Sequence, residues 1–219
     1  MNLQKFIDHT LLKPMASIQE IENLCNEAIQ YQFAAVCINP LYIAEAKNFL
    51  NKGHHQVKIC TVIGFPLGAS TKETKIFETI DAIKKGAQEI DLVISLGALK
   101  SGHDKFVGDE IKEIISAAKS QNQNIIVKAI LEISLLEGEA EKIRAIQIAS
   151  GAGVDFIKTS TGFNNSKATL EDVALMAKYK LPQTKIKASG GIKTKAEALK
   201  FIELGVSRIG TSSGISIVS

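Results

Sequence analysis

Short apolar runs alternate with longer amphipathic segments along the whole chain. The apolar runs are three to seven residues long, which is the length of a strand rather than of a buried helix. Such a run is typical of a strand that is covered on both faces. We therefore predict eight strands, at Ile7–Thr10, Ala34–Ile38, Val57–Ile63, Glu89–Ile94, Ile125–Leu131, Val154–Ser160, Lys185–Ala188 and Arg208–Gly210.

The segments between these runs have helical spacing. In the first of them, apolar residues recur every three or four positions after an opening Ser-Ile-Gln-Glu, which is a capping box. Glycine follows several of the segments, as it commonly does at the C-terminus of a helix. We predict helices at Ser17–Gln30, Leu41–Asn51, Thr71–Lys85, Lys105–Gln121, Leu135–Ser150, Leu170–Lys180 and Lys195–Leu204.

The regular alternation of strands and helices predicts the fold. Parallel strands need right-handed crossovers, and eight such units close into an α/β barrel of the (β/α)8, or TIM, type. A doubly wound open sheet is the alternative, but no Gly-x-Gly-x-x-Gly turn follows an early strand. Only Gly214–Ser219 follow the Arg208–Ser213 segment that contains the last strand, so we expect a short or truncated eighth helix. No linker divides the chain, and we predict one barrel domain over residues 1–219.

Composition narrows the class of protein. Of the 219 residues, 45% are hydrophobic, which supports a large core and excludes a disordered chain. The net charge is +3 and the lysines are spread along the chain, so no nucleic-acid partner is expected. The three cysteines form no Cys-x-x-Cys pair, and no signal peptide or membrane-spanning segment is visible. We therefore expect a soluble, cytoplasmic protein with no membrane partner.

Four predicted strands carry a charged residue where a doubly covered strand should be apolar. Asp91, Lys128, Lys158 and Lys187 each alternate with apolar neighbours, so all four side chains are expected to point into the barrel. A single lysine at a strand edge would extend to water. Four such positions on successive strands favour a functional cluster, because burying an unpaired charge is costly.

Buried lysines next to one another have a specific chemical use. Burial and a nearby cation both lower the pKa of a lysine from its reference value of about 10.4. A neutral lysine can attack a carbonyl carbon and form a Schiff base. Lys158 and Lys187 are such a pair, with Asp91 and Lys128 as charge partner and proton relay. The spacing does not decide which lysine is the nucleophile.

The last predicted strands end in loops that are suited to an anion. The seventh is followed by Ser189–Lys193, with two glycines, and the eighth by Gly210–Gly214, with three hydroxyl residues. Barrels commonly bind phosphate after their seventh and eighth strands, where glycine lets backbone N–H groups approach the ligand. The sixth ends in Thr159–Gly162, which has the same character. Ordinary turns are the alternative interpretation, and we favour a phosphate site.

Several motifs resemble, in order, those of the deoxyribose-phosphate aldolase family, which are class I aldolases. The segment that carries the resemblance best is Asp155-Phe-Ile-Lys-Thr-Ser-Thr-Gly162, which is similar to the Schiff-base strand of that family. The remaining blocks extend from one end of the chain to the other. They are Asp8–Pro14, Val36–Pro40, Val62–Gly68, Glu89–Val93, Lys128–Glu132, Lys187–Ile192 and Arg208–Ser213.

The resemblance implies a role for each of the central residues. Lys158 would form the covalent imine, Lys187 would perturb it and take part in proton transfer, and Asp91 would belong to a proton relay. Other matches are to pocket or phosphate positions of the family. They are Asp8, Thr10, Cys37, Lys128, Thr161, Gly162, Gly190, Gly191, Lys193, Gly210, Ser212 and Ser213. A small buried hydrophobe is an equally good interpretation of Cys37.

The resemblance also implies the reaction. It is the reversible cleavage of 2-deoxy-D-ribose 5-phosphate to acetaldehyde and D-glyceraldehyde 3-phosphate, in deoxynucleoside catabolism. No cofactor and no metal are expected, because the protonated imine accepts the electron pair. A homodimer or a homotetramer is expected. Two alternatives stay open: a non-catalytic barrel that binds a sugar phosphate, and a lysine aldolase for a different phosphorylated aldehyde.

Overall fold

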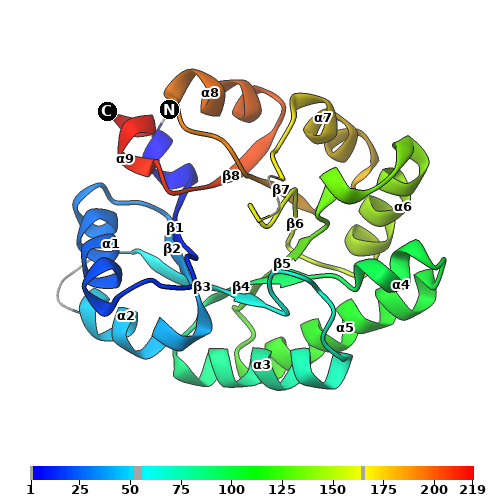
Figure 1. Ribbon diagram of the computed structural model, residues 1–219, viewed down its shortest axis with the longest axis horizontal. Coiled ribbons are helices and arrows are strands. Elements are labelled where there is room, and N and C mark those ends of the chain that lie inside the picture. The colour runs from blue at the N-terminus through cyan, green and yellow to red at the C-terminus, as the bar shows by residue number, and fades with distance from the viewer. Residues whose placement is uncertain (1, 52–55, 164–165) are drawn as a thin grey trace.

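The protein is a closed barrel of parallel strands surrounded by helices (Figure 1). The computed structural model describes residues 2–51, 56–163 and 166–219. Each strand pairs with the next in chain order, and the last pairs with the first, which closes the barrel. The strands are β1 (Ile7–Leu11), β2 (Ala35–Ile38), β3 (Lys58–Ile63), β4 (Glu89–Val93), β5 (Ile126–Ile130), β6 (Phe156–Lys158), β7 (Lys185–Ser189) and β8 (Val206–Thr211).

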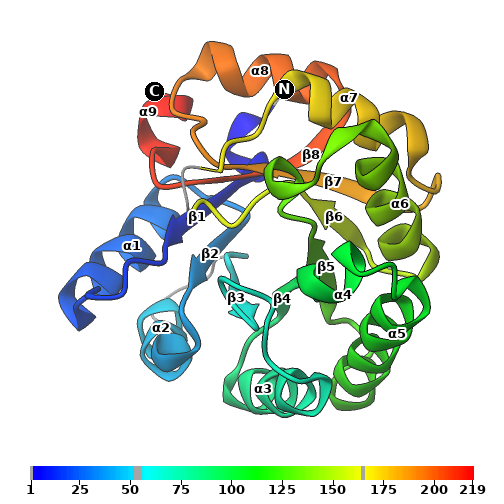
Figure 2. The same cartoon turned by 45° about the vertical axis from the view of Figure 1, so that its right-hand side comes forward.

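The helices form the outer layer, as both views show (Figure 2). The α-helices among the described residues are α1 (Ile18–Gln30), α2 (Ile43–Leu50), α3 (Lys72–Lys85), α4 (Leu96–Lys100), α5 (Asp104–Gln121), α6 (Gly138–Gly151), α7 (Leu170–Tyr179), α8 (Lys195–Glu203) and α9 (Gly214–Val218). Short 3-10 turns occur at η1 (Leu3–Phe6), η2 (Pro40–Tyr42) and η3 (Ile133–Leu135).

The main core lies between the strands and the helices. Outward-facing residues such as Ile90, Leu92, Val127 and Ile186 are fully buried against this helical layer. A second, smaller apolar cluster lies inside the barrel at β2 and β3. The rest of the barrel interior holds the charged side chains together with a few apolar ones, such as Val93, Ile130 and Phe156. This division places the charged residues of the strands in one enclosed space.

The structure confirms all eight predicted strands and the barrel they form. Two strands differ from the prediction by more than two residues in length. The run Val154–Ser160 contributes only the three residues of β6, and just beyond its end the Thr159 side chain takes up the backbone groups of Ser189. Its hydroxyl donates to the carbonyl of Ser189 and accepts from the N–H of the same residue. Conversely, β8 is longer than predicted.

The seven predicted helices are present, and the eighth helix is short, as expected. That helix is α9, which packs against α8, β1 and η1. A side chain at Gly214 would approach His9 Nδ1 to 2.9 Å, so only glycine lets α9 lie this close to β1. The short α4 was not predicted, because five residues carry too little periodic pattern. Among the described residues, no helix has the length and apolarity needed to cross a membrane.

Candidate active site

Asp91 lies at the centre of the barrel interior and contacts three lysines. Its Oδ1 accepts a hydrogen bond from Lys128 Nζ at 2.9 Å, and its Oδ2 accepts from Lys158 Nζ at 2.8 Å and Lys187 Nζ at 2.7 Å. Strand register explains the meeting, because Asp91 is the Cα partner of Lys128, and Lys158 that of Lys187. The prediction that these four side chains point into the barrel is confirmed.

A second set of charges lies nearer the N-terminal ends of the strands. Asp8 on β1 forms an ion pair with Lys187 (Oδ2 to Nζ, 2.5 Å), and Glu89 on β4 forms one with Lys128 (Oε2 to Nζ, 2.7 Å). Arg208 on β8 lies between the two acids. Its Nη1 donates to Asp8 Oδ1 and its Nη2 to Glu89 Oε1. Each carboxylate therefore bridges two cations.

These contacts close into a loop of alternating charge, which we call the charge ring. It comprises, in order of contact, Asp91, Lys187, Asp8, Arg208, Glu89 and Lys128. With all six groups ionised, three negative charges balance three positive charges. Lys158 is a fourth cation attached to the ring at Asp91, and no second carboxylate of a described residue is in ion-pair contact with it.

The ionisation of the ring follows from its pairing. Burial alone would raise the pKa of Asp91, but Lys128, Lys158 and Lys187 hold it well below its usual value. Burial alone would lower the pKa of Lys187, but Asp8 and Asp91 hold it well above. The pKa of Lys128 is likewise raised, chiefly by Asp91 against the effect of burial. The ring therefore stays charged, because each ion is paired with two of opposite sign.

Two thiols stand beside the ring. Cys37 and Cys60 are Cα partners on β2 and β3 and share a hydrogen bond. Cys60 Sγ donates to Asp91 Oδ1 at 3.2 Å and accepts from Lys128 Nζ at 3.4 Å. Ligand atoms of Cys37, Cys60 and Asp91 lie within 4.8 Å of one another, as a metal site would require. A metal ion there would have to displace the lysines from Asp91 and would be repelled by their charge.

A cavity of about 580 Å³ opens above the cluster at the C-terminal ends of the strands. Lys158 lines it, whereas Asp91, Lys187 and Lys128 lie below its wall. Asp8 and Cys37 also lie below, fully buried. The predicted residues that line the cavity are Thr10, Lys158, Thr161, Gly162, Gly190, Gly191, Lys193, Gly210, Ser212 and Ser213.

The turn after β7 is glycine for reasons of space. Gly190 and Gly191 have φ angles of 98° and 81°, in the left-handed region that favours glycine. A side chain at Gly190 would approach the carbonyl oxygen of Ser166 to 2.6 Å. Ala168 also donates its N–H to the Gly190 carbonyl, at 3.1 Å. The turn is therefore packed directly beneath the loop between β6 and α7.

That loop is anchored by an acid from the neighbouring strand. Glu132, buried after β5, accepts from the N–H of Thr161 at 3.2 Å and from its hydroxyl. Phe163 packs edge-on against Phe65 from the loop after β3, with ring centroids 5.2 Å apart. These contacts hold Thr161 and Phe163 at the mouth of the cavity, next to Lys158.

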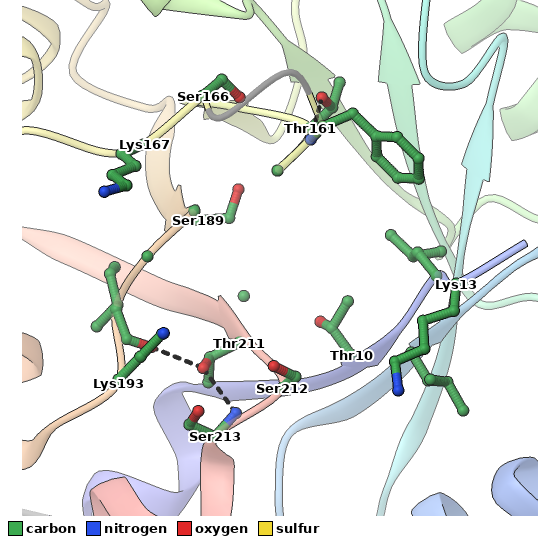
Figure 3. Close-up of a pocket in the computed structure, with 18 of the residues that line it drawn as sticks. Thr10, Lys13, Thr161, Ser166, Lys167, Ser189, Lys193, Thr211, Ser212 and Ser213 are labelled. Atoms are coloured by element: carbon green, nitrogen blue, oxygen red, sulfur yellow. Dashed lines mark hydrogen bonds between the residues drawn. The ribbon is translucent and has the colours of Figure 1, made fainter. Parts of the chain in front are cut away.

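Three lysines stand around this mouth. Lys13 lies on one side, and Lys167 and Lys193 lie on the other (Figure 3). All three are exposed. The hydroxyls of Ser212 and Ser213 lie between them, and the N–H of Ser213 donates to Thr211 Oγ1 at 2.9 Å. The arrangement combines positive charge, hydroxyl groups and glycine backbone, which suits a phosphate group.

Sequence reasoning missed several residues of this site. Glu89 and Arg208 complete the charge ring. The sequence could have indicated Glu89, because it lies two positions before Asp91 and therefore on the same face of the strand. Lys13 and Lys167 lie in loops, where no periodicity marks a side chain as cavity-lining. Glu132 is the last residue of the Lys128–Glu132 motif, and the sequence pattern assigned it no separate role. Its left-handed backbone (φ 47°) marks it as a constrained position.

Comparison with known proteins places the chain in a family. A family model described as DeoC/LacD family aldolase matches residues 3–218. The deoxyribose-phosphate aldolase of Bacillus cytotoxicus is 51% identical over 218 residues, which are 100% of this chain and 95% of that protein. The protein of the same name from Clostridium kluyveri is 53% identical over 217 residues, covering 99% and 97% of the two chains.

Solved structures agree with this assignment. The structure titled "QR15, an Aldolase" superposes with a TM-score of 0.90 at 42% identity, covering 99% of this chain and 94% of the other. The Aeropyrum pernix deoxyribose phosphate aldolase, whose title describes a unique tetrameric structure, gives a TM-score of 0.89 at 33% identity and covers 99% and 89%. The chain belongs to the DeoC/LacD family of aldolases.

Proposed function

We propose that the protein reversibly cleaves 2-deoxy-D-ribose 5-phosphate into acetaldehyde and D-glyceraldehyde 3-phosphate through a Schiff base at Lys158. Membership of an aldolase family and the printed names of relatives at about half identity support this substrate. The single observation that supports the role of Lys158 is its place as the unbalanced cation of the cluster, facing the cavity.

Charge balance identifies the lysine that can become neutral. Lys128 and Lys187 each contact two carboxylates, and Arg208 does so too and cannot lose its proton. Lys158 contacts one carboxylate, and Asp91 Oδ2 shares that contact with Lys187. If Lys158 is neutral, the buried cluster is uncharged. A neutral amine at the cavity wall is the nucleophile that imine formation needs.

The first half of the reaction forms the imine. The Lys158 nitrogen adds to the C1 carbonyl of the open-chain sugar and gives a carbinolamine. Loss of water from that carbinolamine gives a protonated imine. We assign delivery of the proton that leaves with this water to Lys187, whose raised pKa keeps it charged beside Asp91.

Carbon–carbon cleavage follows. A base takes the proton of the C3 hydroxyl, the C2–C3 bond breaks, and its electron pair moves toward the imine nitrogen to give an enamine. Glyceraldehyde 3-phosphate leaves. The enamine carbon is protonated, and water then hydrolyses the acetaldehyde imine and regenerates Lys158. We assign these proton transfers to Asp91 and Lys187, because Lys158 and Lys187 both donate to Asp91 Oδ2.

We assign the phosphate to the end of the cavity formed by the loops after β6, β7 and β8. Exposed Lys193 and the hydroxyls of Ser212 and Ser213 supply charge and donors there. Gly190, Gly191 and Gly210 leave room for the neighbouring Ser166, Lys167 and Lys187, and Gly162 also lines this cavity. On the other side of the cavity, Thr10 is placed to contact the sugar, while Thr161 fixes the loop. Asp8, Cys37 and Lys128 lie below the cavity wall, and we assign them an influence on the reaction only through the buried cluster.

Borohydride trapping tests this proposal. The protein is incubated with acetaldehyde, reduced and digested, and the peptides are analysed by mass spectrometry. A single ethyl group on Lys158 is expected, together with aldolase activity toward deoxyribose 5-phosphate. Lys158→Met should lose both, and Lys178→Met, which removes an exposed lysine of α7, should lose neither. Phosphate-ligand binding without trapping would instead identify a sugar-phosphate-binding barrel.

Activity toward other phosphorylated aldehydes, but not toward glyceraldehyde 3-phosphate, would identify a different lysine aldolase. A panel of acceptors in the synthetic direction measures this. The homodimer or homotetramer and the cytoplasmic location stay predictions. Light scattering on the purified protein would measure the first.

A further inference from the structure

Glu89 and Arg208 belong to the charge ring but not to the cavity. Glu89 is 1% exposed, and neither residue lines the cavity. Arg208 contacts Asp8 and Glu89, and these acids contact Lys187 and Lys128. Both residues are thus separated from Lys158 by at least two other charged groups. The burial of these two charged residues needs an explanation, because a buried ion pair generally stabilises a protein no more than apolar residues of the same shape would.

We propose that Glu89 and Arg208 are positioning residues whose charges set, through the charge ring, the pH at which Lys158 becomes a free amine. The inference rests on the proposed function, because it takes Lys158 as the nucleophile. It assigns the two residues no contact with substrate. Their effect is electrostatic, and it therefore has a sign that can be reversed.

The sign follows from counting charges. The intact ring has three acids and three bases, so protonating Lys158 adds one uncompensated charge to a buried cluster. Neutralising Glu89 leaves the ring with an excess positive charge, which further disfavours a proton on Lys158. Neutralising Arg208 leaves the ring with an excess negative charge, which favours a proton on Lys158. In the barrel interior such effects are weakly screened by solvent.

All strands contribute to the groups that face this cluster, so the count is made over the whole barrel interior. The charged members come from β1, β4, β5, β6, β7 and β8. The thiols of Cys37 and Cys60 belong to β2 and β3, and burial, together with the hydrogen bond that Cys60 shares with Cys37, raises the pKa of Cys60 well above its usual value. His9 on β1 points away from the cluster and contacts Glu27 at 2.6 Å.

A purely structural brace would behave differently. If the ring only held Asp91 and Lys187 in place, losing either Glu89 or Arg208 would loosen the same site and lower the rate at every pH. A brace thus predicts two losses of similar form. The charge model predicts two shifts in opposite directions.

The test is the pH dependence of kcat/KM for deoxyribose 5-phosphate, whose acid limb reports the free enzyme. Glu89→Gln is nearly isosteric and keeps an oxygen for Arg208. It should move the acid midpoint to lower pH, so that activity below the wild-type midpoint rises roughly tenfold. Arg208→Met should move the midpoint to higher pH, with a roughly tenfold loss at the same pH. The double variant should return close to the wild-type midpoint.

Two controls separate charge from structure. Arg208→Lys keeps the charge but not the two-pronged contact, and should keep the wild-type midpoint. Glu73→Gln removes an acid from the exposed face of α3 and should leave the profile unchanged. Circular dichroism and the pH dependence of acetaldehyde trapping on Lys158, measured per folded molecule, give a second reading that does not depend on turnover.

A midpoint that stays or rises in Glu89→Gln would overturn the proposal, and so would shifts of the same direction in Glu89→Gln and Arg208→Met. If Glu89→Gln does not fold, the double variant and Arg208→Lys test the proposal instead. An acid midpoint that differs from that of the wild type in either of them would contradict the proposal. These outcomes leave the proposed function standing. That function fails separately, if wild-type protein neither traps acetaldehyde on Lys158 nor cleaves the substrate.

Discussion

Two buried ion clusters in this molecule invite comparison. One is the charge ring with Lys158 inside the barrel, and the other is the pair Lys75–Glu110 in the helical layer. Both side chains of the pair are fully buried, with Nζ and Oε1 2.9 Å apart. Ser95 completes the pair, because its hydroxyl and its N–H both donate to Glu110, at 2.8 and 3.1 Å. The pair has one acid and one base, and no charge is left over.

The two clusters differ in whether one cation is left without a carboxylate of its own, and in whether that cation faces a cavity. Lys75 joins α3 to α5, and its chain packs so closely on Gly64 that a side chain there would come within 2.9 Å of Cε. It lines neither the cavity above the barrel nor any part of its wall. Lys158 has a shared carboxylate and an open cavity in front of it. A buried charge is therefore no sign of chemistry by itself. The feature that indicates chemistry is a cation in excess of its carboxylate partners that faces a cavity.

The largest expected effect comes from removing that surplus cation. Lys158→Met should lower kcat/KM by on the order of 10⁴-fold or more, since no other described lysine of the cluster reaches the cavity. The fold should remain, because the charge ring is balanced without Lys158. A steady-state assay and a thermal melt measure the two quantities. Retained turnover would show that the nucleophile lies elsewhere, and a large loss of stability would show that the ring needs Lys158.

Removing a cation of the ring itself should have the next largest effect. Lys187→Leu leaves the ring with an excess negative charge, which favours a proton on Lys158 and removes a proton donor. We expect a loss of about 10² to 10⁴-fold near neutral pH, partly recovered as the pH rises and the amine is freed. Lys185→Met, at the exposed start of the same strand, is the matched control. Normal activity across the whole pH range would contradict the role of Lys187.

The helical-layer pair should respond in stability rather than in chemistry. Lys75→Met leaves Glu110 buried without its cation and should reduce the free energy of unfolding by about 3–5 kcal/mol. Combining it with Glu110→Leu removes both charges and should restore most of that loss. Urea unfolding measures both variants. Turnover per folded molecule should stay near that of the wild type, and a specific loss of turnover would mean that this pair also acts on the active site.

The sequence predicted the barrel from the number of alternating strands and helices, and it predicted the central cluster from short-range periodicity. Alternation over two residues marked Asp91, Lys128, Lys158 and Lys187 as inward-facing. The charge ring could not be predicted in the same way. Arg208 and Asp8 are 200 positions apart and meet only because β8 pairs with β1. Which side chains meet where the barrel closes depends on the register between its first and last strands, and residue spacing within one strand does not report that register.

The cavity was predicted only in part, for a related reason. Glycine and hydroxyl residues after β7 and β8 indicated the end of the cavity to which we assign the phosphate, since barrels place binding loops there. Lys13 and Lys167 were missed, because a lysine in a loop has no alternation that fixes its direction. What places Lys167 is the contact of its own loop with the Gly190–Gly191 turn, which joins two segments distant in sequence.

The smallest expected effect belongs to a charge pair that is neither buried nor surplus. Lys105 and Asp109 pair across one turn of α5, with side chains 90% and 41% exposed. Water already solvates both ions, so breaking the contact removes little attraction and leaves no buried charge behind. Lys105→Ala should therefore change neither the urea midpoint nor turnover measurably, and added salt should not alter that result. A clear loss of stability in this variant would mean that ion pairing as such, and not burial and charge surplus, separates the clusters of this protein.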